Sequence, residues 1–403
     1  MVAEEVRYEP VSVKAVLAEM KDTAELLIDL SYSAVLGDSD ALAEEVLELE
    51  ARMDLLQMQG RMSLLLAARN PEDAEALAPV LGVIGAAEKV SNATGDIAKI
   101  VLEEIGMPPA IRGGLHDATE SVIRIRAEAG AAAVGVTLGD SHLETETGVR
   151  VIAIRRESAV QKQRWLLNPS AETTVEAGDV LLLRGQEAGL TAAVEAVGDG
   201  SFTPPVRPDG SVPDLERAVD SIVLMKDMSE LAVDLAYGAV LFDSRPVAEE
   251  VSELEVEMDA LKSRLEAWGL RAAAAVDDPV ELRGLFHLAA ATEVISDAAL
   301  EIAEGVLRGI DAHPVVAAAV QESDEVIIRV AVAETARLAG RSLGEQAVQT
   351  ETGMRIIAVR RADGWVVQPD AATTVSAGDV LIAKGTRAGA ERLETLADHA
   401  AGS

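Results

Sequence analysis

The sequence predicts an α+β protein in which a helical bundle and a small β-α-β unit each occur twice, related by a pseudo-two-fold axis. The first observation is a repeat, because residues 145–156 read TETGVRVIAIRR and residues 350–361 read TETGMRIIAVRR, an interval of 205 residues. The second is a helical spacing of apolar residues early in each copy, and the third is a change to strand-like alternation later in each copy. Solenoid repeats span roughly 20–50 residues, so an interval this long indicates an entire duplicated module.

The first part of each copy has the pattern of three consecutive helices. Residues 12–36 contain few helix breakers and are followed by Gly37-Asp38-Ser39-Asp40, which is typical of a helix end. Asn70-Pro71 and Asp278-Pro279 predict the starts of the last helices, 72–105 and 280–309. The middle helix of each copy has one apolar face, formed by Leu42, Val46, Leu49, Met53 and Leu56, and by Val247, Val251, Leu254, Met258 and Leu261. Three helices joined by short turns predict an antiparallel bundle.

The second part of each copy is predicted to be a small β-α-β unit. Strands are expected at 122–126 and 149–154, and in the second copy at 326–332 and 354–359. Thr137 and Ser342 fit helix N-caps, and Ser342 has Glu345 at the spacing of a capping box. A tight Ala-Gly-Asp turn, at 177–179 and 377–379, leads into a last buried strand.

These patterns divide the chain into five parts. The predicted boundaries are 10–118 for the first bundle, 119–197 for the first strand-rich unit, 198–213 for a Gly- and Pro-containing linker, 214–322 for the second bundle and 323–398 for the second strand-rich unit.

Composition excludes several classes of function. The chain has 35 basic and 69 acidic residues, a net charge of −34, which would repel nucleic acid and anionic lipid. It has no cysteine, and no apolar stretch approaches the roughly 20 residues that span a bilayer, so we expect a cytoplasmic protein without membrane insertion. The acidity is typical of adaptation to high salt, although a dedicated acidic interaction surface would give the same composition. No nucleophile–base set emerges, so we expect no enzymatic activity.

The strand-rich units resemble the TrkA C-terminal domain, also called RCK-C. The resemblance rests on GVTL (135–138), TGVRVIAIRR (147–156), Asn168-Pro169 and AGDVL (177–181), and on GRSL (340–343), TGMRIIAVRR (352–361), Gln368-Pro369 and AGDVL (377–381). The helical parts are similar to PhoU-like three-helix bundles, on helix pattern and E-x-x-x-D spacing. The Gly-x-Gly-x-x-Gly half that usually precedes RCK-C is absent, so no NAD or ATP site of that kind is implied.

The PhoU resemblance implies candidate divalent or ferric metal sites in the bundles. Carboxylates at i and i+4 share a helix face, which suits oxygen-binding cations. Glu293 falls in an apolar stripe and requires a metal, a basic residue such as Lys21 or Lys226, or water as its partner. The alternative is a solvated acidic flank, and Asn92 replaces an acid in the first copy. The candidate metal ligands are Glu50, Asp54, Glu88, Glu255, Asp259, Glu293 and Asp297.

The RCK-C resemblance implies a ligand cleft between two paired units. Members of that family bind small ligands there, including cyclic dinucleotides. Arg150 and Arg355 occupy matching positions, and a guanidinium could hold a phosphate bidentately. The alternative is that both arginines are exposed strand residues paired with the abundant acids. The expected cleft residues are Arg150, Val151, Ile152, Arg355, Ile356 and Ile357.

Together the resemblances imply a soluble regulatory subunit of a potassium or other cation transporter or channel. Such a protein would sense a small ligand and pass the signal to a membrane partner, at whose surface it would be peripheral. A homodimer is a further expectation. The alternatives are a PhoU-like metal-binding regulator of phosphate uptake and a structural scaffold without a ligand.

Overall fold

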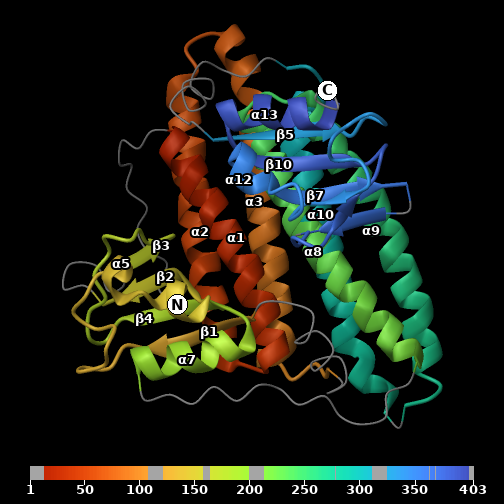
Figure 1. Ribbon diagram of the computed structural model, residues 1–403. Helices are drawn as coiled ribbons and strands as arrows, with labels where there is room; N and C mark the ends of the chain where they lie inside the picture. Colours follow the sequence, from red (N-terminus) through yellow and green to blue (C-terminus); the bar gives the residue numbers. More distant parts are fainter. Residues whose placement is uncertain are drawn as a thin grey trace.

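A computed structural model describes residues 13–107, 121–157, 164–198, 213–276, 278–310, 325–362, 364–367 and 369–398. Within them the predicted α+β class and the two-fold repetition are confirmed (Figure 1). The predicted linker at 198–213 lies outside the described residues, except for its first and last residues.

Each half begins with a bundle of three long helices that pack against one another, as the apolar spacing predicts. The bundles comprise α1 (Val13–Gly37), α2 (Asp40–Ala67) and α3 (Pro71–Leu102), and α8 (Pro213–Leu241), α9 (Arg245–Ala272) and α10 (Arg283–Leu307). A short 3₁₀ turn, η1 (Pro279–Leu282), replaces the first turn of the helix expected from 280. The Ser39 hydroxyl caps α2 by accepting the Leu42 N–H at 3.3 Å, and the Asn70 side chain accepts the Asp73 N–H at 2.8 Å at the start of α3.

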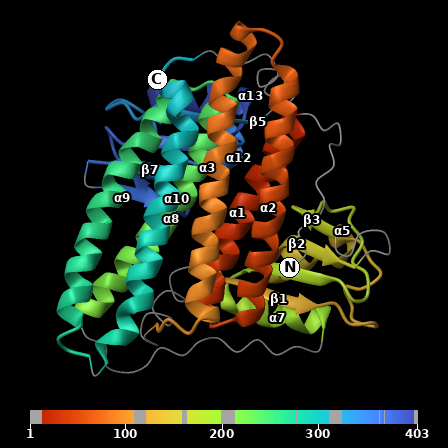
Figure 2. The same cartoon turned by 180° about the vertical axis from the view of Figure 1, so that it is seen from behind.

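The two bundles share one apolar core. Helix α3 packs along α10, and α1 meets α8 near the centre of the molecule (Figure 2). Buried side chains from all six helices belong to a single continuous cluster. Tyr32 of α1 donates its hydroxyl proton to Thr292 of α10, whose own hydroxyl donates to the Leu288 carbonyl at 2.7 Å. The halves therefore form one body, as a duplicated module that replaces a dimer would.

Each bundle is followed by a four-stranded antiparallel sheet. The first contains β1 (Ser121–Arg126), β2 (Arg150–Arg156), β3 (Arg164–Leu167) and β4 (Val180–Gly185) in the order β1-β4-β2-β3. The second contains β5 (Glu325–Ala331), β7 (Met354–Arg361), β8 (Gly364–Val367) and β10 (Val380–Thr386) in the order β5-β10-β7-β8, beside the short pair β6 (Arg341–Ser342) and β9 (Thr374–Val375). The helices of these units are α5 (Leu138–Ser141), α6 (Leu143–Thr147) and α7 (Glu187–Val197), and α12 (Val348–Thr352) and α13 (Arg387–Asp398).

Both faces of each sheet are covered. One face of the first sheet contributes Val122, Ile152 and Leu182 to the bundle core. The opposite face, with Val151 and Ile154, packs in a separate cluster that includes residues of α7. The sheet is therefore held between its bundle and its own terminal helix, which the sequence had not predicted.

The connecting turns follow the predicted chemistry with one difference. Thr137 caps α5 by accepting the Asp140 N–H at 3.1 Å, and Gly148 and Gly353 end α6 and α12 with φ of 71° and 76°. Ser342 and Glu345 form both hydrogen bonds of a capping box, at 3.0 and 3.1 Å, but they close a turn, and the next helix, α12, begins only at Val348. None of the helices in the described part of the chain is both long and apolar enough to cross a bilayer.

Candidate functional site

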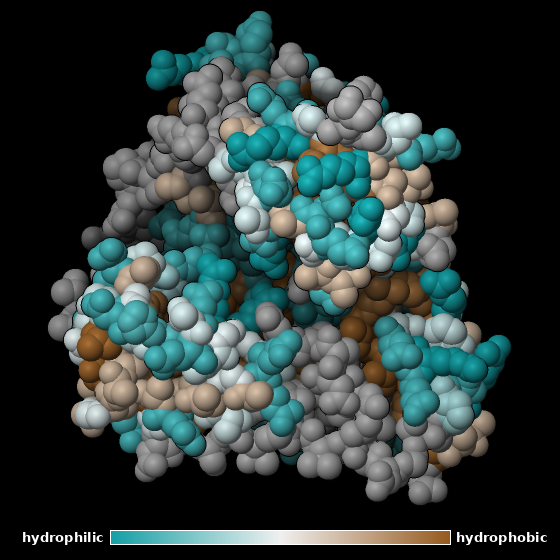
Figure 3. Space-filling view, viewed as in Figure 1, coloured by the Kyte–Doolittle hydropathy of each residue, from teal (hydrophilic) through white to brown (hydrophobic). Residues whose placement is uncertain are grey.

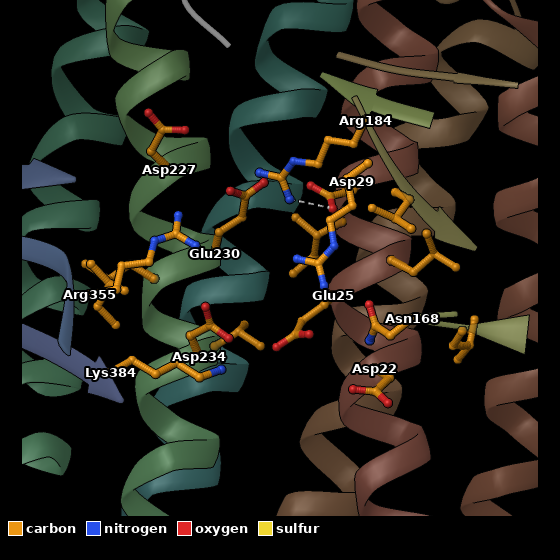
Figure 4. A pocket seen from close by; sticks show the side chains of 18 of the residues that line it. Asp22, Glu25, Asp29, Asn168, Arg184, Asp227, Glu230, Asp234, Arg355 and Lys384 are labelled. Carbon is orange, nitrogen blue, oxygen red and sulfur yellow. Dashed lines mark hydrogen bonds and ion pairs between the residues drawn. The ribbon is translucent and has the colours of Figure 1, made fainter. Parts of the chain in front are cut away.

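A cavity of about 710 Å³ lies where α1 meets α8, with one sheet on each side. It opens into the hollow between the two sheet units that Figure 3 shows, and Figure 4 shows its interior. Pockets of roughly 300–1,000 Å³ hold small organic ligands and cofactors. The cavity is mainly polar, and its charged residues come from both halves of the chain.

The floor of the pocket is acidic. Spacings of three and four residues place the carboxylates of each helix on one face, and the interval of 205 relates the two sets. The floor residues are Asp22, Glu25 and Asp29 of α1, and Asp227, Glu230 and Asp234 of α8.

The walls of the pocket are basic. Arg150 on β2 and Arg184 on β4 come from the first sheet, and Arg355 on β7 and Lys384 on β10 come from the second. Arg184 Nη1 donates to Asp29 Oδ2 at 2.9 Å. The side chains of Arg150 and Arg355 are exposed and form no hydrogen bond or ion pair with any other described residue. Two guanidinium groups are thus available in a pocket that is otherwise crowded with ion pairs.

Carboxyl groups from the two halves meet on the floor, and their proton affinities differ. Burial raises the pKa of Asp29 to about 6, against the lowering effect of Arg184. Burial and the nearby Glu25 carboxylate raise the pKa of Asp234 well above its usual range. Although burial opposes it, the hydrogen bond with Asp234 and the charge of Lys21 hold the pKa of Glu25 below its usual value. The Asp234 side chain lies deep in the protein but keeps 42% exposure to the pocket, so its desolvation is only partial.

The structure separates the six predicted cleft residues into two sets. Arg150 and Arg355 line the pocket together with Ile152 and Ile357. Val151 and Ile356 are buried on the opposite faces of their sheets, inside the cores of the strand-rich units. Helices α1 and α8 supply the floor, so the cavity is bounded by four parts of the chain and not by the strand-rich units alone (Figure 4). The matching acids of α1 and α8 were visible in the repeat, although sequence reasoning gave them no role.

The predicted metal residues have other partners. Glu88 accepts hydrogen bonds from Gln57 and from Arg61, the latter at 3.4 Å. Glu293 pairs with Lys262 at 2.6 Å, and not with Lys21 or Lys226 as proposed from the sequence.

Nor do the remaining candidates form a metal site. Burial and the charges of Glu293 and Asp259 raise the pKa of Asp297, and burial with the charge of Asp259 raises that of Glu255. No three acidic or histidine side chains among the described residues come together in a geometry that could hold an ion. Glu50 and Asp54 of α2 belong to no such group.

A second charged arrangement joins each sheet to its bundle. Glu45 of α2 is 3% exposed and accepts hydrogen bonds from Arg124 Nε at 2.7 Å and Arg155 Nη2 at 2.6 Å. In the second half, Glu250 of α9 is 2% exposed, accepts a hydrogen bond from Arg329 and forms an ion pair with Arg360 at 3.3 Å. The glutamate and both arginines of the first half recur in the second half at the interval of 205 residues. This repetition is the signal in the sequence that could have identified them. Buried carboxylates with two guanidinium partners fix the orientation of each sheet on its helices.

The second arginine of each Arg-Arg pair has an internal role. Arg156 binds Asp179 of the Ala-Gly-Asp turn through two hydrogen bonds, from Nε at 2.8 Å and from Nη2 at 2.7 Å. Asp179 also accepts the Glu176 N–H at 2.8 Å, and Arg361 and Asp379 are the matching pair. The repeated motifs at 147–156 and 177–181 are therefore partly structural.

Comparison with known proteins identifies both kinds of unit. The model of the PhoU domain matches residues 17–101 and 222–306, and that of the TrkA-C domain matches residues 122–198 and 327–398. Uncharacterized protein YrvC of Bacillus subtilis (strain 168) is 45% identical over 65 residues, which is 16% of this chain and 37% of that protein. The chain thus spans well under half the length of this curated relative.

Solved structures show the same two likenesses at low identity. PhoU from Pseudomonas aeruginosa is 12% identical with a TM-score of 0.42, covering 74% of this chain and 96% of its own. The GsuK channel bound to NAD is 15% identical with a TM-score of 0.18, covering 69% of this chain and 53% of its own.

Proposed function

Because the chain is an alternating array of two PhoU domains and two TrkA-C domains, we propose that it is a soluble cytoplasmic regulatory subunit of a potassium or other cation transporter or channel. The pocket between its halves would bind a small anionic ligand. The two TrkA-C domains, which resemble the regulatory module of potassium transporters and channels, are the reason to expect a channel or transporter as partner.

The observation that carries the ligand proposal is the pair of available guanidinium groups. Arg150 and Arg355 are related by the repeat and reach the same cavity from opposite sheets. Guanidinium groups bind phosphate and carboxylate through paired, charge-assisted hydrogen bonds. Ile152 and Ile357 add apolar walls beside them. A compact ligand with phosphate groups, a cyclic dinucleotide among them, suits these two guanidinium groups and the volume of the cavity.

The signal would pass from the sheets to the bundles. A ligand that draws Arg150 and Arg355 together would move the two sheets toward each other. Glu45 and Glu250 attach these sheets to α2 and α9, so the helices would be pulled along. The helices that carry these glutamates would then move relative to each other. Such a change requires that the ligand bind the two arrangements with different affinity.

Two measurements test the proposal. Calorimetric titration with cyclic dinucleotides and mononucleotides should detect a ligand, and Arg150→Ala or Arg355→Ala should weaken its binding by at least roughly tenfold. Arg308→Ala, at an exposed position at the end of α10, is the matched control and should bind as the parent protein does. In cells that lack the protein, potassium uptake should respond to the parent chain and to Arg308→Ala but not to Arg150→Ala. Unaltered potassium uptake without the protein would favour a scaffold role.

The phosphate-uptake alternative is not favoured. It depends on metal held by the bundle carboxylates, and Glu293 and Glu88 already have protein partners, Lys262 and Gln57.

A further inference from the structure

The contact between α1 and α8 places two carboxyl groups from opposite halves of the chain against each other. The side chains of Glu25 and Asp234 point toward each other across this junction (Figure 4), and Lys21 lies close to both. Ionised carboxylates only accept hydrogen bonds, so two carboxyl groups that face each other can bond directly only when one of them carries a proton. Both groups lie on the floor of the pocket.

We propose that Glu25 and Asp234 share one proton that closes the junction between the two halves, and that loss of this proton separates α1 from α8 and widens the pocket. Two like charges that face each other in a partly buried site repel strongly, as in other carboxyl pairs that share a proton. The pocket thereby gains a response to pH that needs no other ligand, so its test is independent of the proposed anion site.

Basic groups around the pair reduce the repulsion without removing it. Lys21 of α1 pairs with Glu25, and its Nζ lies 3.9 Å from Asp234 Oδ1. Lys384 of β10 lowers the proton affinity of both carboxyls. Arg355 of β7 lines the same cavity.

Other groups near the pair act in the opposite direction or are neutral. Asp22 of α1 adds negative charge to the floor, and the same is true of Glu230 of α8. Tyr237 of α8 is buried, and its hydroxyl has no hydrogen-bond partner among the described residues. Burial and the charges of Glu25 and Asp22 raise its pKa, so it remains protonated and adds no charge.

The matching pair on the other side of the pseudo-two-fold axis is an internal control. Asp29 corresponds to Asp234, and Glu230 corresponds to Glu25. Here Arg184 replaces Lys384 and binds Asp29 at 2.9 Å, while Lys226 binds Glu230 at 2.6 Å. The Arg184 guanidinium lowers the pKa of Asp29 against the effect of burial, so that it rises only to about 6. We therefore expect a shared proton at neutral pH at only one of the two related positions.

The width of the pocket can be measured directly. The chain has no cysteine, so Glu146→Cys with Glu351→Cys gives a unique pair of labelling sites on α6 and α12, both exposed and related by the repeat. The spin–spin distance in the full chain should lengthen when the pH rises from about 6 to about 9 and return on acidification. Asp234→Asn keeps the hydrogen bond without the charge, and should abolish this lengthening. Glu25→Gln should do the same.

A second readout and a matched variant keep the interpretation unambiguous. Infrared spectra at about pH 7 should show a protonated-carboxyl band in the parent protein that is lost in Asp234→Asn. Asp29→Asn should retain both the band and the lengthening above pH 7. The proposal is overturned if the distance does not change with pH, if Asp234→Asn and Glu25→Gln respond as the parent does, or if Asp29→Asn abolishes the response equally. Should Asp234→Asn not fold, Glu25→Gln and the parent spectrum decide the question alone.

Discussion

Replacing one buried glutamate should loosen the attachment of the first sheet to its bundle. In Glu45→Gln the side chain keeps its shape and one acceptor oxygen, but it loses the charge that holds Arg124 and Arg155. We therefore expect the sheet to leave the bundle more often, without global unfolding of the helices.

The magnitude follows from the two contacts. Hydrogen bonds to charged groups contribute about 1.5–3 kcal/mol each, and removing one partner of a buried ion pair costs about 3–5 kcal/mol. Arg124 keeps 27% exposure and can regain water, and Glu48 lies 4.0 Å from Arg155, so the lower part of this range applies. A loss of about 3 kcal/mol in the free energy of local opening corresponds to a roughly 140-fold larger population of the open state, and to amide exchange faster by about that factor, since each 1.4 kcal/mol is a factor of ten.

Amide hydrogen exchange of β1 is the appropriate assay. The Val122 N–H donates to the Ser33 hydroxyl of α1 at 3.0 Å, so its exchange rate reports directly on separation of sheet and bundle. Glu44→Gln removes an exposed charge from the same turn of α2 and is the control. Equal exchange of β1 in Glu45→Gln and Glu44→Gln would refute the assigned role of Glu45.

Three further outcomes are expected. Ala87→Thr places a hydroxyl in α3 at the position that corresponds to Thr292, which should give the Tyr237 hydroxyl a partner and stabilise the protein by about 1 kcal/mol. Thr292→Ala should destabilise the protein by a similar amount. A lower melting temperature for Ala87→Thr, measured by calorimetry, would contradict this. Asp29 binds its proton more tightly in the folded state, with a pKa of about 6 against 3.8, so the stability should fall as the pH rises through this interval. In Asp29→Asn the melting temperature should no longer depend on pH in this interval, although it should still change with pH above about pH 7. Gly189→Ala would place a Cβ 2.2 Å from the Thr147 carbonyl oxygen and should lower the melting temperature. Gly85→Ala in α3, where an added Cβ meets no atom within 4 Å, should be neutral or stabilising. The reverse order of melting temperatures would refute the packing argument.

The fold was predictable because its signals are periodic and present twice. Helix caps such as Ser39 and Asn70 and the glycines at 148 and 353 act locally, so their geometry follows from a few neighbouring residues. The terminal helices α7 and α13 were not predicted, although α7 contributes part of the separate core beneath the first sheet. Recognising that the sheets are covered on both sides requires these helices.

The site was predictable only in part, and the reason lies in the strand itself. Residues 151–154 are all apolar because both faces of β2 are buried, so the sequence contains no alternation that tells which residues face the pocket. Both Val151 and Ile152 were therefore proposed as cleft residues, although only Ile152 lines the pocket and Val151 lies in the core of the strand-rich unit. The partner of Glu293 depends on how α9 and α10 pack against each other. Its ion pair with Lys262 is a tertiary contact, which helix periodicity does not reveal.

Duplication within one chain gives this pocket a property that a homodimer lacks. In a symmetric dimer the two carboxyl pairs would face identical cations and titrate together. Here both halves have kept the matching floor carboxylates, but the first sheet has Arg184 where the second has Lys384. Because a guanidinium binds a carboxylate through a fixed fork and an ammonium as a single point, the two pairs hold their protons differently. The same divergence occurs away from the pocket, where Tyr32 has Thr292 as its partner. The Tyr237 hydroxyl has no partner among the described residues, and Ala87 stands at the position that corresponds to Thr292. The proposed anion between Arg150 and Arg355 would therefore meet two unlike ends, so that its binding could be oriented and coupled to protons held differently at each end.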